Sequence, residues 1–350
     1  MPDLLTSILK KLLNQPTAPF HEYHVRAQIE QLLLDVPHVE LSTDAYGNLL
    51  ATYRKGKHKS NPIWAFGAHM DHPAWVKNHK GDWEFLGGVP KAITEDPANL
   101  KHRKEHGSIA TWDFAVHIED RVSEVEEGSD ALVSSDTIVE AAACDDLVGC
   151  AAIVAVFKEL ARLNLDATVH AAFTRAEEVG FLGAWHLGKH WPFGKDSVFL
   201  SIETSRPVNG AEMGNGPVVR VGDRMSIFDN ELIAILQRTA AEQGIRVQRS
   251  LLDAGSCEAT AIQGCGIRSA GLSIPLGNYH NLDDDDSSNL TPEYVMLDDV
   301  KSVVNLLVAL VATEHPGLGE RSLEERIALR TKEFKKHLEA GNAKFEELSA

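Results

Sequence analysis

The chain lacks any apolar run that approaches the roughly 20 consecutive residues a helix needs to cross a bilayer. Its first 15 residues, MPDLLTSILKKLLNQ, are amphipathic and contain neither a continuous apolar core nor a small-residue cleavage site. The sequence therefore predicts no secretion signal and no membrane partner.

Cysteine is scarce. The 350 residues include four cysteines, Cys144, Cys150, Cys257 and Cys265, and no two of them form a Cys-x-x-Cys pair. A disulfide scaffold is not expected in a chain of this size. We interpret the four residues as buried, reduced thiols, which predicts a cytoplasmic protein.

Positive charge is also in short supply, because 34 Lys and Arg residues face 51 Asp and Glu residues and leave a net charge of -17. Such a chain is poorly suited to nucleic acid or an anionic membrane as its main partner. The hydrophobic share of 43% and the charged share of 24% are ordinary for a globular protein with a large core.

Apolar runs alternate with amphipathic segments along most of the chain. Strand-like runs lie at 63–69, 169–174, 198–203 and 267–274, and helix-like segments lie at 147–163, 182–190 and 231–244. This alternation predicts an α/β fold, with a mostly parallel central sheet flanked by helices.

The pattern changes between residues 73 and 140, where short β segments lie in polar, charged surroundings. We interpret 73–140 as a small β-rich inserted domain, which would serve dimerisation or substrate gating and interrupts a main domain of residues 1–72 and 141–315. Residues 316–350 are expected to form a charged helical tail, either a solvated appendage or a partner-binding helix.

Five apolar runs each deliver a His, Asp or Glu at or just beyond their C-terminal end. In open α/β sheets, ligands bind outside the carboxyl ends of the strands, so these side chains are expected to meet in one crevice. They are His69, Asp145, the Glu177–Glu178 pair, Glu203 and His280.

Two histidines and three carboxylates suit a pair of divalent cations, zinc by preference, although cobalt and manganese accept the same ligands. Asp145 is expected to bridge the pair from a strand-to-helix turn. His69 and Glu203 would complete one site, and His280 and Glu178 the other.

Glu177 is left over by this assignment and would accept a proton from water between the ions. Asp71 lies two residues beyond His69, on the same face of the strand. It is expected to form a hydrogen bond with the imidazole and to orient it.

Each of these residues alone has a simpler interpretation. A lone histidine is more often structural, a Glu-Glu pair is usually solvated, and Asp145–Asp146 could cap a helix. Their joint occurrence at five strand ends favours a metal site. Histidines 72, 79, 102, 106, 117, 170, 186 and 190 are interpreted as structural, and 283–286 as a solvated acidic loop that could instead attract a cationic substrate.

The motifs GAHMD, CDDLVGC, EEVGFLGA and the late YH resemble those of the cytosolic di-zinc aminopeptidases, which include the glutamyl aminopeptidases and the tetrahedral TET peptidases. The resemblance covers most of residues 1–313. It implies a metallopeptidase main domain that releases N-terminal residues from peptides. It also implies metal ligands at His69, Asp145, Glu178, Glu203 and His280, with Glu177 as general base and Asp71 beside the first histidine.

The chain departs from that family at several points. Glu203 stands where the family usually has Asp, and the late Gly-Thr-Asp-Ala element is replaced by residues 255–259, GSCEA. The insertion is short for the family, and the charged tail has no evident counterpart. Because family members use the insertion for contacts between subunits, the resemblance also implies a homo-oligomer.

Together these observations predict a di-metal exopeptidase, an aminopeptidase with a peptide substrate. A carboxypeptidase or N-acyl amino acid deacylase on the same scaffold is the first alternative, and it would need a cation such as Arg175, Arg206 or Arg224 for the substrate carboxylate. A non-catalytic metal-binding assembly protein is the second.

Overall fold

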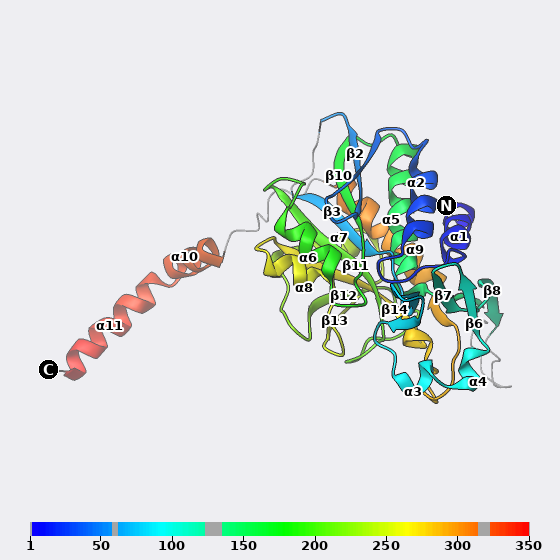
Figure 1. Ribbon diagram of the computed structural model, residues 1–350. Coiled ribbons are helices and arrows are strands. Elements are labelled where there is room, and N and C mark those ends of the chain that lie inside the picture. Colours follow the sequence, from blue (N-terminus) through cyan, green and yellow to red (C-terminus); the bar gives the residue numbers. More distant parts are fainter. Residues whose placement is uncertain (1, 58–61, 123–134, 314–322, 350) are drawn as a thin grey trace. The chain divides into compact units, whose positions relative to one another are not determined.

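A computed structural model of the chain describes residues 2–57, 62–122, 135–313 and 323–349 (Figure 1). Contacts between residues divide the chain into two compact units, Met1–Glu314 and His315–Ala350. Within the described ranges, no helix combines the length and the apolar character that a bilayer span requires.

Eleven strands of the described chain form one mixed sheet, in the order β1-β2-β10-β3-β11-β14-β15-β9-β8, with β12 beside β14 and β13 beside β12. The central pairs β10–β3, β3–β11 and β11–β14 are parallel, which confirms the predicted α/β class. The strands are β1 (Val39–Thr43), β2 (Leu49–Lys55), β3 (Ile63–His69), β8 (His117–Val122), β9 (Ser135–Ala141), β10 (Ala167–Thr174), β11 (Ser197–Ser205), β12 (Val218–Asp223), β13 (Gln248–Leu252), β14 (Ser269–Gly277) and β15 (Glu293–Met296).

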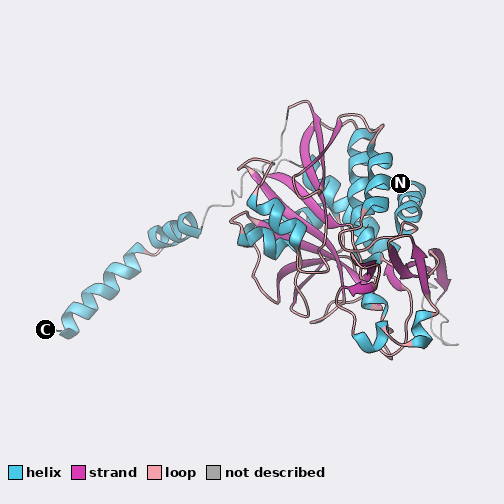
Figure 2. Cartoon of the chain, viewed as in Figure 1, coloured by secondary structure: helices cyan, strands magenta, loops and turns pink. Residues whose placement is uncertain are grey.

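Helices cover this sheet (Figure 2). The helix α5 packs on β3 and β11 because residues 147–157 are almost entirely apolar and are all buried. The helices α1, α2 and α9 contact α5. The helix α8 contacts β11 and β14, and α6 packs against α8. Their bounds are α1 (Pro2–Leu13), α2 (Tyr23–Leu33), α5 (Cys144–Arg162), α6 (Leu182–Lys189), α7 (Asn230–Gln243), α8 (Glu258–Gly264) and α9 (Leu297–Ala312).

A second, antiparallel sheet of order β5-β4-β7-β6 lies within the region predicted as an insertion. It packs around Trp75 and Trp112, whose rings are arranged edge to face with their centroids 4.4 Å apart. The strands β8 and β9 from the same region instead join the large sheet through β15. Residues 123–134 of the predicted insertion lie outside the described residues. The elements of the small sheet and its neighbourhood are β4 (Ala74–Lys77), β5 (Trp83–Leu86), α3 (Lys91–Thr94), α4 (Pro97–Leu100), β6 (Arg103–His106) and β7 (Ile109–Trp112).

The second unit contains two helices, α10 (Leu323–Glu333) and α11 (Lys335–Ser349). Arg330–Glu333 and Lys335–Glu339 form ion pairs along them at helical spacing. Exposed pairs of this kind contribute little to stability. The role of this tail stays a prediction.

The order of the central strands determines what lies at their ends. β3 runs between β10 and β11, and β14 follows on the far side of β11. Thr174, the last residue of β10, is in register with His69, the last residue of β3. The carboxyl ends of four adjacent parallel strands therefore open onto one region of the molecule.

Candidate metal centre

Residues that are far apart in the sequence meet at these strand ends. His69 ends β3, Glu177 and Glu178 lie in the turn after β10, and Glu203 lies near the end of β11. His280 belongs to a short 3-10 segment, Tyr279–Asn281, that follows β14. Asp145 lies at the start of α5, where its φ and ψ of -80° and 109° are not helical.

The Asp145 carboxylate faces both histidines. Its Oδ1 atom lies 3.2 Å from His69 Nε2, and its Oδ2 atom lies 3.9 Å from His280 Nε2. Both imidazoles are nearly fully buried. Burial alone would raise the pKa of Asp145, but the neighbouring His69 imidazole, with His280 adding to its effect, lowers it to about 2. Asp145 is therefore an ionised carboxylate with one oxygen directed at each imidazole.

The other two carboxylates divide between the histidines. Glu203 Oε1 lies 3.4 Å from His69 Nε2, and Glu178 Oε2 lies 3.2 Å from His280 Nε2. The donor atoms of Asp145, Glu178 and His280 all lie within 4.8 Å of one another. The geometry thus gives each imidazole a terminal carboxylate of its own and one shared carboxylate.

Asp146 also lies within reach of His69 and Glu203. Its oxygens, however, accept main-chain N–H groups from His69 at 3.3 Å and from Gly149 at 3.2 Å. The contact with Gly149 is a cap on the first turn of α5, the simpler role considered for this pair of aspartates. Asp146 is therefore engaged with the backbone, whereas Asp145 is directed into the centre.

A further observation, the lack of hydrogen-bond partners for several buried polar atoms, indicates that the residues present fit a pair of cations. Asp145 Oδ1, Glu178 Oε1, Glu203 Oε2 and His280 Nε2 are buried and have no hydrogen-bond partner among the described residues. Buried polar atoms are nearly always paired. These unpaired atoms lie around the two histidines, and carboxylates and imidazoles are the ligand types that zinc-like ions take.

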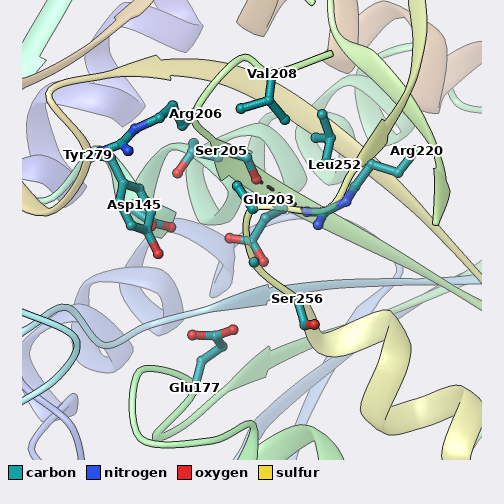
Figure 3. Close-up of a pocket in the computed structure, with 13 residues that line it drawn as sticks. Asp145, Glu177, Glu203, Ser205, Arg206, Val208, Arg220, Leu252, Ser256 and Tyr279 are labelled. Atoms are coloured by element: carbon teal, nitrogen blue, oxygen red, sulfur yellow. Dashed lines mark hydrogen bonds between the residues drawn. The ribbon is translucent and has the colours of Figure 1, made fainter. Parts of the chain in front are cut away.

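Glu177 lies beside these donor atoms but is not one of the residues assigned to a cation. Its Oε2 atom is 3.9 Å from His69 Nε2. In Figure 3 its carboxylate faces Glu203 across a cavity that Asp145 also lines. Burial raises the pKa of Glu177, with Glu203 and Glu178 adding to the effect and His69 opposing it. A bound dication would oppose this rise.

The contact predicted between Asp71 and the imidazole differs from the observed one. His69 Nδ1 lies 3.1 Å from the main-chain oxygen of Asp71, whereas the nearest carboxylate oxygen is 3.7 Å away. The Asp71 carboxylate instead accepts the N–H groups of Glu177 and Glu178, at 3.0 and 3.1 Å. A carbonyl can only accept, so Nδ1 of His69 carries a proton, and Nε2 faces Asp145. The imidazole is oriented by the backbone, and the carboxylate holds the turn after β10.

His72, which we interpreted as structural, lies inside the centre. Its Nδ1 atom is 2.7 Å from the main-chain oxygen of Asp145, and its Nε2 atom is 3.1 Å from Asn281 Oδ1. Burial, together with the neighbouring His280, lowers the pKa of His72 to about 4. The close spacing of His69, Asp71 and His72 in GAHMDH was the only sequence signal for it.

Glu258, in the segment that departs from the family pattern, is buried and receives a hydrogen bond from the Thr174 hydroxyl. Burial raises its pKa to about 8, although His69 opposes the change. Glu258 is thus engaged with Thr174, and it does not belong to the groups of donor atoms around the two histidines.

A cavity of about 110 Å³ adjoins the centre. Arg220 and Arg206 both line it (Figure 3). Arg220 is 2% exposed, and Nη1 donates to Ser205 Oγ at 3.2 Å. Its Nε atom has no hydrogen-bond partner among the described residues, and its charge lowers the pKa of Glu203, which lines the same cavity. Arg220 was not among the cations considered from the sequence.

Among the arginines that were considered, Arg175 pairs with Glu22 at 2.7 Å, and the main-chain N–H of Arg224 donates to the carbonyl of Gly255.

The fold gathers histidines and carboxylates at the strand ends of a mixed α/β sheet. Residues 113–291 match the sequence profile of the M42 glutamyl aminopeptidase family, and the chain belongs to that family. It is a peptide hydrolase. The matched range contains Asp145, Glu177, Glu178, Glu203 and His280.

Known proteins resemble the chain over most of its length. A protein of Acetivibrio thermocellus, provisionally named an aminopeptidase, is 28% identical, and the alignment covers 78% of this chain and 88% of that one. The TET1 peptidase of Pyrococcus horikoshii has a TM-score of 0.66 at 22% identity, covering 88% of this chain and 99% of its own. An aminopeptidase of Desulfurococcus kamchatkensis has a TM-score of 0.68 at 20% identity, and the match covers 91% of this chain and 97% of that one. These structures share the fold.

Proposed function

We propose that the chain is a metal-dependent aminopeptidase, which removes N-terminal residues from peptides with the help of two divalent cations. The observation that carries this proposal is the Asp145 carboxylate, whose two oxygens face His69 and His280 separately at 3.2 and 3.9 Å. A bridging carboxylate with one histidine on either side is suited to paired ions about 4 Å apart.

Five residues would hold the cations. Asp145 would bridge them, His69 and Glu203 would bind one, and His280 and Glu178 would bind the other. The unpaired buried donor atoms of this set support the assignment. Zinc suits these ligands, and cobalt and manganese accept them too.

Such cations, when bound, polarise the peptide carbonyl and make the attacking water more acidic. Glu177 is the one carboxylate at the cavity that this assignment leaves free. It takes the proton from the attacking water and delivers it to the leaving amine. Asp71 keeps the Glu177 backbone in place through the hydrogen bond at 3.0 Å.

Arg220 indicates which side chain the cavity accepts. A buried guanidinium is costly unless an anion pairs with it. The carboxylate of an N-terminal Asp or Glu would supply that anion, while the free α-amino group of the substrate would meet the carboxylates of the centre. We therefore propose a preference for acidic N-terminal residues.

The same arginine also favours a second candidate, a carboxypeptidase or N-acyl amino acid deacylase, in which Arg220 or Arg206 would bind the terminal carboxylate of the substrate. Hydrolysis of unblocked aminoacyl anilides, against N-acetylated dipeptides with a free carboxylate, separates the two. Cleavage of the blocked dipeptides alone would overturn the aminopeptidase proposal. Membership of a peptide-hydrolase family argues against the non-catalytic alternative.

Assembly and location belong to the same proposal. The TET1 peptidase of P. horikoshii is described as assembling into a tetrahedron or a large octahedral shell, and we propose that this chain is also a homo-oligomer. All four cysteines are free, which fits a reducing cytoplasm. A mass of 38.3 kDa by light scattering, that of one chain, would contradict the oligomer.

A further inference from the structure

Glu22 occupies the N-cap position of α2, yet its side chain caps no amide of that helix. Carboxylates at this position usually accept an N–H from the first turn. The Glu22 side chain is only 2% exposed, and it is directed at another segment, the turn that follows β10. Its location therefore serves a contact outside its own helix.

One oxygen of Glu22 joins two loops that are distant in sequence. Oε1 accepts the N–H of Phe20 at 2.8 Å and the N–H of Ala176 at 3.1 Å. Both residues are left-handed, with φ of 68° and 54°, a conformation that residues other than glycine rarely adopt. Contacts around each residue must hold it there, and Glu22 supplies the same acceptor to both.

The other oxygen of Glu22 holds Arg175. Oε2 lies 2.7 Å from Arg175 Nε, while Nη2 donates to the carbonyl of Phe20 at 2.8 Å and Nη1 to that of Tyr46 at 3.1 Å. The main-chain N–H of Arg175 donates to Asn48 Oδ1 at 3.0 Å. The residue that begins the turn is thus fixed through its side chain and its backbone.

The turn held in this way presents the catalytic pair. Ala176 directly precedes Glu177 and Glu178, whose own amides bind Asp71. Three consecutive N–H groups, 176 to 178, are therefore held by two buried carboxylates, Glu22 and Asp71.

The loop that bears Glu22 is itself anchored. Thr17 Oγ1 donates to the main-chain oxygen of Met70 at 2.6 Å, next to His69. Ala18 packs with Ala74, Val76 and Ile109 of the small sheet. Glu22 therefore acts from a fixed support rather than from a free loop end.

We propose that Glu22 is a positioning residue for the reaction: through Ala176 and Arg175 it sets where Glu177 and Glu178 point. The inference rests on the proposed function, since it takes Glu177 as the base and Glu178 as a ligand. Glu22 is not in the proposed ligand set and does not line the cavity.

The test uses the full chain loaded with zinc and the variants Glu22→Gln, Ala176→Gly and the two combined. A glutamine has one acceptor oxygen and cannot serve Phe20, Ala176 and Arg175 together. At saturating zinc, we expect kcat to fall about ten- to a hundredfold with KM changed less than about threefold, as for other supporting partners of a site. Affinity for zinc, measured by chelator competition, should fall several-fold because Glu178 shares the turn.

Ala176→Gly distinguishes positioning from general damage. Glycine adopts a positive φ without strain, so the double variant should regain about fivefold or more of the lost kcat. Glu30→Gln is the matched control, since Glu30 lies on α2 and, among the described residues, forms its ion pair with the partly exposed Arg26. It should leave kcat and zinc affinity unchanged.

Three results would overturn the role of Glu22: an unchanged kcat and zinc affinity in folded Glu22→Gln, a loss explained wholly by missing zinc, or no recovery in the double variant. If Glu22→Gln does not fold, Glu22→Asp, which is one methylene shorter, is judged by the same criteria. Absence of hydrolysis by the unaltered chain would count against the proposed function, while the zinc affinities would still decide the role of Glu22.

Discussion

The carboxylate of Glu293 accepts the main-chain N–H of Asp145 at 2.9 Å. Its second oxygen accepts the N–H of His280 at 2.8 Å. Glu293 is fully buried in β15, whereas Asp145 begins α5 and His280 follows β14. One side chain thus fixes the spacing between the proposed bridging ligand and one of the two histidines.

Replacing Glu293 with Gln should loosen this spacing, because an amide offers one acceptor where two N–H groups need one each. We expect the affinity for zinc to fall about ten- to a hundredfold, the usual effect of losing a partner that orients metal ligands. Competition with a chromophoric chelator measures it. Glu231→Gln, at an exposed ion pair with Arg268, is the control. Equal affinities in the two variants would refute the role of Glu293.

Glu177→Gln should separate proton transfer from metal binding. The amide keeps the shape of the side chain but cannot accept a proton, so kcat should fall at least about a hundredfold. Two equivalents of metal should remain, because Glu177 is not in the proposed ligand set. Metal analysis and steady-state kinetics on the same preparation test both statements. A variant that stays active would remove Glu177 from its role as base.

Removal of the metal should destabilise the fold as well as abolish activity. Without cations, burial and mutual repulsion raise the pKa of Glu177 and of Glu178, so the centre holds carboxylates in unfavourable surroundings. A ligand at about 100 times its Kd adds about 2.7 kcal/mol to the free energy of unfolding. Scanning calorimetry should therefore show the Tm falling by several degrees on chelation and recovering with zinc, cobalt or manganese.

Asp145→Ala provides the control for this experiment, since loss of the shared carboxylate should leave a Tm that barely responds to metal. If the unaltered chain has the same Tm with and without chelator, the cation pair is not part of the folded centre. Activity that persists after dialysis against chelator, with metal content below one equivalent, would contradict the proposal in the same way.

The sequence predicted the ligand-bearing strands well, because each is a continuous, largely buried apolar run with a polar ligand residue at or soon after its end. β3 has the predicted bounds of 63–69, and α5 starts three residues before the predicted 147. Glu293, Glu22 and Arg220 were not predicted. Glu293 and Glu22 act on the backbone of distant segments, and Arg220 is set apart by its burial beside the cavity, so none carries a local motif.

Asp71 illustrates the same limit. Alternation along a strand correctly placed its side chain near His69, but a two-residue repeat does not distinguish a carboxylate from the carbonyl of the same residue as the partner of Nδ1. The 3.1 and 3.7 Å distances decide in favour of the carbonyl. The turn after β10, which the carboxylate holds instead, follows a sharp bend that strand periodicity does not encode.

Arg220→Gln should alter substrate preference rather than general activity. A hydrogen-bonded charge pair contributes about 1.5–3 kcal/mol, so kcat/KM for substrates with N-terminal Asp or Glu should fall roughly ten- to a hundredfold. Substrates with N-terminal Ala or Leu, which have no anion for the guanidinium, should change less than about threefold. Arg224→Gln is the matched control, because Arg224 is exposed, follows the same strand and does not line the cavity. If Arg220→Gln lowers kcat/KM equally for acidic and apolar substrates, the cavity does not select for acidic side chains, and the buried cation has a structural role alone.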